Sequence, residues 1–100
     1  MAVLYITEYS TLGGSFEGGP AQMALQPPVA EQTVAIGGTS ASSAAFNAKT
    51  RLVRLHADAI CSIEFGTSPT ATTSTARMAA GQTEYFTLKG GLKVAVIANT

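Results

Sequence analysis

The chain has 100 residues, of which 12% are charged and 46% hydrophobic, and equal numbers of acidic and basic residues give a formal net charge of zero. This length makes one domain, spanning residues 1–100, that buries about 64% of its unfolded surface, enough for a core without disulfides or a structural metal. The low, balanced charge argues against a nucleic-acid groove, because the lysines and arginines are scattered along the sequence.

Residues 2–9 form the first expected strand, with apolar side chains on both parities. No basic segment precedes it and Thr7 and Glu8 interrupt its apolar run, so we expect no signal peptide here. A flexible glycine-rich loop is expected over residues 12–19. Residues 1–19 comprise this strand and the glycine-rich loop. The strand either pairs within its own subunit or acts as an arm that adds to the sheet edge of a neighbour.

Three further strands are expected in the first half of the chain. One contains residues 21–25 and ends at residues 27–28, because these two prolines cannot donate to a ladder. The next covers residues 29–36 and stops at the glycines of residues 37–38, and a weaker strand covers residues 42–46.

Apolar and polar residues alternate between Val53 and Gly66, which is the clearest pattern in the chain. The apolar positions are Val53, Leu55, Ala57, Ala59, Cys61, Ile63 and Phe65. The alternation predicts either one long strand or two strands joined by an odd-length loop, and we favour a hairpin because strands are usually shorter. Cys61, the single cysteine, is expected to be a reduced core residue.

A neutral polar segment, residues 67–75, follows this pattern and is expected to be a loop. Another strand is expected over residues 76–79. Phe86 and Leu88 share a parity with Leu92, Val94 and Val96 across the three-residue loop of residues 89–91. This predicts a final hairpin with glycine in the left-handed position. Residues 94–98 are apolar on both parities, which is typical of a central strand.

Regular turn residues and the absence of a helical period predict an all-β fold. We expect a compact antiparallel β-sandwich of Greek-key or jelly-roll type with eight or nine short strands. No apolar stretch is long enough to span a membrane.

The sequence offers no constellation of side chains for catalysis or for metal binding. His56 and Asp58 have no nucleophile placed beside them, and His56 and Cys61 lie on opposite parities, which separates the one candidate zinc pair. We therefore expect no enzyme activity, no cofactor and no metal. Tyr5, Tyr9, Tyr85 and Phe16 are candidates for an aromatic sugar platform, although aromatic residues of a sandwich more often lie in the core or in an interface.

The alternating segment and its surroundings resemble small β-sandwich virion proteins of tailed bacteriophages. The resemblance rests on residues 50–72 and 78–86, with residues 4–9 and 93–97, and consists of core alternation and turns. It implies a non-catalytic structural protein, first of all a capsid decoration or cement protein that binds the head exterior and stabilises capsomer contacts. A neck, tail or baseplate component is the alternative, and a carbohydrate-binding β-sandwich module is the alternative from another class.

This resemblance also implies the partners: the major capsid protein or other virion proteins, further copies of the chain in a homo-oligomer, and neither nucleic acid nor membrane. Assembly is then expected in the host cytoplasm, and the final location is the capsid surface of the virion. A weakly charged surface suits this role, because neighbours cover it on assembly. The expected partner contacts are Tyr5, Tyr9, Phe16, Thr67, Thr70, Thr72 and Thr73.

Overall fold

Strands and connecting loops make up the whole of the described chain, which covers residues 2–14, 20–24 and 26–99 of a computed structural model. No helix occurs in these ranges, and so none that could cross a membrane. The strands are β1 (Val3–Tyr9), β2 (Leu12–Gly14), β3 (Pro20–Ala24), β4 (Ala30–Ala35), β5 (Ala41–Ser42), β6 (Leu52–Ala57), β7 (Cys61–Gly66), β8 (Ala76–Met78), β9 (Thr83–Thr87) and β10 (Lys93–Ala98).

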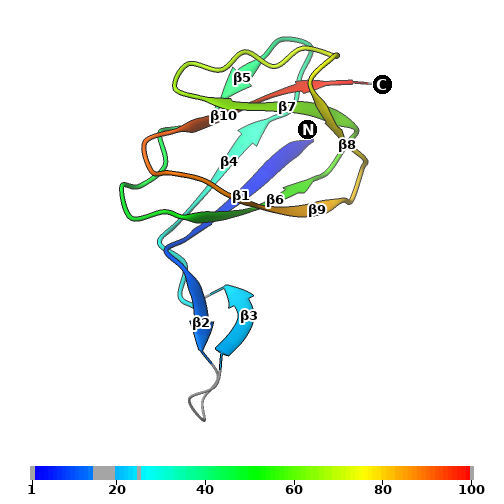
Figure 1. The fold of residues 1–100 in the computed structure, drawn as a ribbon. Helices are drawn as coiled ribbons and strands as arrows, with labels where there is room; N and C mark the ends of the chain where they lie inside the picture. The colour runs from blue at the N-terminus through cyan, green and yellow to red at the C-terminus, as the bar shows by residue number, and fades with distance from the viewer. Residues whose placement is uncertain (1, 15–19, 25, 100) are drawn as a thin grey trace.

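Eight of these strands form two antiparallel sheets that face each other (Figure 1). The β1 sheet has the strand order β4-β1-β6-β9, and the β10 sheet has the order β5-β10-β7-β8. The remaining two strands, β2 and β3, pair with each other and project from one end of the sandwich. The all-β sandwich is therefore confirmed, with ten strands in the described residues where we expected eight or nine.

Strand pairs are nested around the connection between β7 and β8. β7 pairs with β8, β6 with β9, and β5 with β10, so that each pair encloses the one before it. Successive pairs lie in alternate sheets. β4 pairs with β1 in the sheet that also contains β6 and β9. A double sheet wound in this way is a jelly roll, one of the two predicted forms.

The hairpin predicted within residues 53–65 is wrong, because β6 and β7 lie in opposite sheets. The buried face is nevertheless confirmed at Val53, Leu55, Ala57, Cys61 and Ile63, whereas Ala59 and Phe65 are half-buried and Ser62, on the polar parity, is also buried. The connection of residues 58–60 crosses from one sheet to the other, and an odd-length connection keeps the same parity facing the core in both cases. Parity alone therefore does not distinguish a hairpin from a crossing between sheets.

The predicted final hairpin is wrong for the same reason. β9 pairs with β6 in the β1 sheet, whereas β10 pairs with β5 and β7 in the other sheet. The central position of β10 is confirmed, and Gly91 adopts the predicted left-handed conformation with φ of 89°. Glycine is thus required at this crossing for its backbone conformation.

Three segments in the first half of the chain differ from the expected elements. Residues 12–14 form β2 and not a loop, because they find a ladder partner in β3, and pairing outweighs the low strand propensity of glycine. The weak fourth strand shortens to β5, beyond which Ser43 and Phe46 still donate backbone hydrogen bonds of 2.8 Å to residues 94 and 92. β1 pairs on both sides within its own subunit, so its ladder is not free for a neighbour.

The core fills the space between the sheets. Cys61 lies within it, and burial raises the pKa of its thiol. The buried cluster consists of Leu4, Ile6, Val34, Ile36, Phe46, Val53, Leu55, Ala57, Cys61, Ile63, Met78, Val94 and Val96.

Candidate partner-contact surfaces

The segment between β7 and β8, residues 67–75, is here called the threonine loop. It lies at the innermost turn of the nested strand pairs, on the outside of the sandwich (Figure 1). The structure places all four predicted contact residues of this loop at the surface: the side chains of Thr67, Thr70, Thr72 and Thr73 are exposed. The loop therefore presents hydroxyl and methyl groups without formal charge.

Hydrogen bonds to distant parts of the chain hold the threonine loop in place. The backbone N–H of Ala71 donates to Ser40 Oγ at 2.9 Å, and the Ala71 side chain is buried beneath the loop. The Asn99 amide donates to the carbonyl of Thr73 at 3.1 Å and to Ser62 Oγ at 2.7 Å. Because these bonds fix the loop before any partner arrives, binding through it costs less conformational entropy.

A second surface is the outer face of the β1 sheet, here called the outer face. Its side chains alternate with the buried ones, so Tyr5 and Thr7 point outward between Leu4, Ile6 and Glu8. In register across β4, β1, β6 and β9, one row reads Thr33, Tyr5, His56 and Thr83, and the next reads Glu31, Thr7, Arg54 and Tyr85. Among the described residues, the two exposed large hydrophobic side chains both lie here: Tyr5 at 44% and Tyr85 at 57% exposure.

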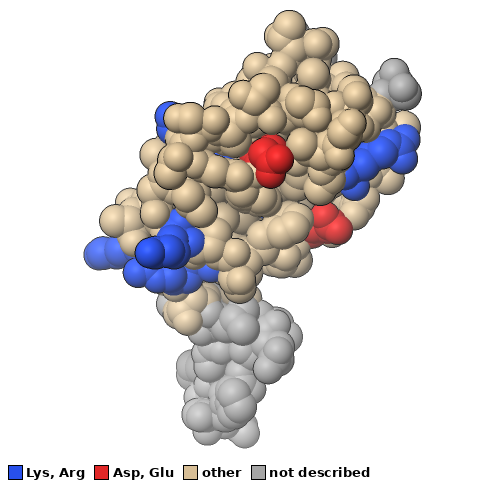
Figure 2. Space-filling model, turned by 45° about the horizontal axis from the view of Figure 1, so that its top comes forward, with Lys and Arg blue, Asp and Glu red and all other residues tan. Residues whose placement is uncertain are grey.

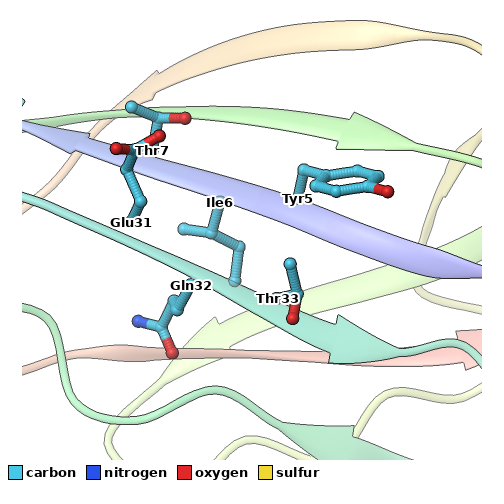
Figure 3. A pocket seen from close by; sticks show the side chains of 6 residues that line it. All are labelled: Tyr5, Ile6, Thr7, Glu31, Gln32 and Thr33. Atoms are coloured by element: carbon cyan, nitrogen blue, oxygen red, sulfur yellow. The ribbon is translucent and has the colours of Figure 1, made fainter.

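Tyr5 is a predicted contact residue that is exposed on the outer face. Its ring lies 6.3 Å from the His56 ring, centroid to centroid, and His56 Nδ1 is 2.7 Å from Thr83 Oγ1. Beside Tyr5, between β1 and β4, lies a shallow depression of about 340 Å³ that Glu31 and Thr33 also line (Figure 3). The face thus combines aromatic surface with hydrogen-bonding groups.

The other two aromatic residues expected at partner contacts, Tyr9 and Phe16, add nothing to the exposed surface that the structure describes. Tyr9 is buried at 5% exposure, and its hydroxyl accepts a hydrogen bond of 3.4 Å from Gln26 Nε2. The position of Tyr9 in β1 points outward, and Gln26, in the segment that follows β3, bonds to its hydroxyl. Phe16 lies outside the described residues.

The fold also gathers basic residues that are far apart in the sequence. The Arg51 carbonyl accepts a hydrogen bond of 3.0 Å from the N–H of Leu88, so the turns that carry Lys49 and Lys89 lie side by side. Figure 2 shows Lys and Arg gathered at the lower left of its view, with isolated charges elsewhere on that face. Basic residues that are scattered along the sequence therefore come close together in the fold.

His56 and Asp58 do not meet in a reactive arrangement. His56 bonds to Thr83 on the outer face, whereas Asp58 is exposed in the connection between the sheets. Within the described part of the chain, no three His, Cys, Asp or Glu side chains converge where they could hold a metal ion.

Comparisons with models of protein families, with curated proteins and with solved structures return no match for this chain.

Proposed function

We propose that this chain is a non-catalytic structural protein of a phage virion, which decorates the head exterior and stabilises contacts between capsomers. The observation that carries the proposal is the threonine loop, which is exposed, uncharged and held in one conformation by Ser40 and Asn99. The sequence resemblance to small virion proteins and the jelly-roll sandwich support the same role.

Capsid binding through this loop works by shape and by neutral polar contact. Four exposed threonines offer methyl groups for apolar contact and hydroxyls for hydrogen bonds, with no charge to desolvate. Because the loop is already ordered, little of the contact energy is lost in fixing it. Modest affinity at each site is then multiplied when several linked copies bind neighbouring capsomers.

The alternative within the virion is a component of the neck, tail or baseplate. The same loop and sandwich suit that location, and copy number separates the two roles. A decoration protein occupies repeated sites over the whole head, whereas a neck or tail component forms a small ring.

A carbohydrate-binding module is the second candidate, and the exposure of Tyr5 and Tyr85 on one face favours it. Aromatic rings stack on the apolar faces of sugars, and the depression beside Tyr5 carries hydrogen-bonding groups. The burial of Tyr9 removes one ring from the expected platform. Binding to a glycan array that is lost in Tyr5→Ala would support this candidate over the first.

Heads assembled without the protein provide the direct test of decoration. Added protein should co-sediment with them to saturation and raise the temperature at which they break open. Replacing Thr70 and Thr72 together by lysine should abolish binding, whereas the control Ala80→Lys, at an exposed position in the turn between β8 and β9, should bind normally. Protein that neither binds such heads nor changes their resistance to heat would contradict the proposal.

A further inference from the structure

The outer face carries one positive and one negative side chain in a symmetric relation to β1. Thr7 on β1 is in register with Glu31 of β4 on one side and with Arg54 of β6 on the other. Neighbouring strands are about 4.8 Å apart, so the two charged residues stand about 10 Å from each other across β1. A two-fold axis along β1 would exchange the positions of Glu31 and Arg54.

We propose that the outer face is the interface of a symmetric dimer, occupied by the outer face of a second copy of this chain. With the two-fold axis along β1, β4 of each copy lies over β6 of the other. Glu31 of each copy then stands opposite Arg54 of the second copy, and the pair forms twice, as an isologous interface requires. Face-to-face sheets pack about 10 Å apart, a gap that these two long side chains span.

The other side chains of the face fit this arrangement. Tyr5 lies on β1, so the two copies of its exposed ring meet near the axis. His56 and Thr33 occupy the row of Tyr5 on β6 and β4, so His56 of each copy faces the uncharged Thr33 of the second copy and no like charges meet. Tyrosine and arginine are enriched in protein interfaces, and a self-complementary charge pair favours a second copy over an unrelated partner.

This inference deepens the proposed function, because it assigns an interface to the expected homo-oligomer and leaves the threonine loop free for the capsid. The dimer itself does not depend on the capsid, so the two ideas can fail separately. In the dimer, paired sandwiches would present two threonine loops to neighbouring capsomers.

Sedimentation equilibrium of the purified chain tests the interface by charge exchange. The wild type should be a dimer, and Arg54→Glu or Glu31→Arg alone should weaken association by about tenfold or more, because each places like charges together twice. The double variant with both substitutions restores opposite charges and should regain most of the affinity. Glu64→Arg, an exposed acidic position on the other sheet, serves as a control and should dimerise normally.

Two results would overturn the dimer. One is a wild-type chain that remains a monomer at every concentration measured, including a monomer whose Tyr5 face binds glycans. The other is association that the single variants do not weaken or that the double variant does not restore. If a monomeric chain binds heads, the dimer interface is wrong and the decoration role still holds. If a charge-dependent dimer does not bind heads, the interface is right and the decoration role is wrong.

Discussion

Glu8 Oε1 accepts a hydrogen bond of 2.8 Å from Thr50 Oγ1, and both side chains are buried. The same oxygen accepts the backbone N–H of Asn47 at 2.8 Å, and the second carboxylate oxygen accepts from Gln32 Nε2 at 3.2 Å. One buried acid on β1 thus joins the edge strand β4 to the turn that precedes β6.

Glu8→Ala should destabilise the protein by about 2 kcal/mol or more, because the substitution leaves buried donors without an acceptor. Urea unfolding followed by circular dichroism measures this change. Glu64→Ala, at an exposed acidic position, is the control and should change stability by less than about 0.5 kcal/mol. Equal effects of the two substitutions would show that the Glu8 network does not hold the turn.

Gly90→Ala should destabilise the fold by about 1–3 kcal/mol through overpacking. A Cβ atom at Gly90 would collide with the carbonyl oxygen of Asn47 and would lie 2.7 Å from both Cα and O of Ala48. Gly37→Ala is the matched control, because a Cβ there meets nothing within 4 Å. Thermal unfolding of both variants checks the prediction, which fails if Gly90→Ala melts at the temperature of the control.

Cys61 should resist thiol reagents at about pH 8 in the folded protein and react fully in urea. Burial raises the pKa of its thiol, so the unfolded chain loses this proton at a lower pH than the folded chain does. The contribution of Cys61 to stability is therefore complete below the ordinary thiol pKa and declines as the pH rises above it. Cys61→Ala should flatten that decline, and an unchanged slope would contradict the buried thiol.

Asn99→Ala should loosen the threonine loop by removing the hydrogen bonds to Thr73 and Ser62. Amide hydrogen exchange in the loop should become about tenfold faster, which corresponds to the loss of about one hydrogen bond. Ser74→Ala, at an exposed position in the same loop, should leave exchange unchanged. If Asn99→Ala exchanges like the wild type, the loop is ordered by other contacts.

The sequence predicted which side chains form the core better than it predicted how the strands connect. Alternation from Val53 to Phe65 identified the buried face, but the sheet in which β7 lies depends on its long-range pairing with β10, which a local period does not contain. The exposed threonines of the loop followed from composition alone. The interior role of Glu8 and the burial of Tyr9 could not be predicted, because Thr50 and Gln26 meet them only through the tertiary fold.

The proposed role on a phage head is tested most directly by a reconstruction of the particle. If the proposed decoration role holds, density for the β-sandwich should lie at regularly repeated positions on the outside of the head, with the threonine loop facing the major capsid protein. Density confined to the neck or tail, or a particle that contains none of this protein, would contradict it.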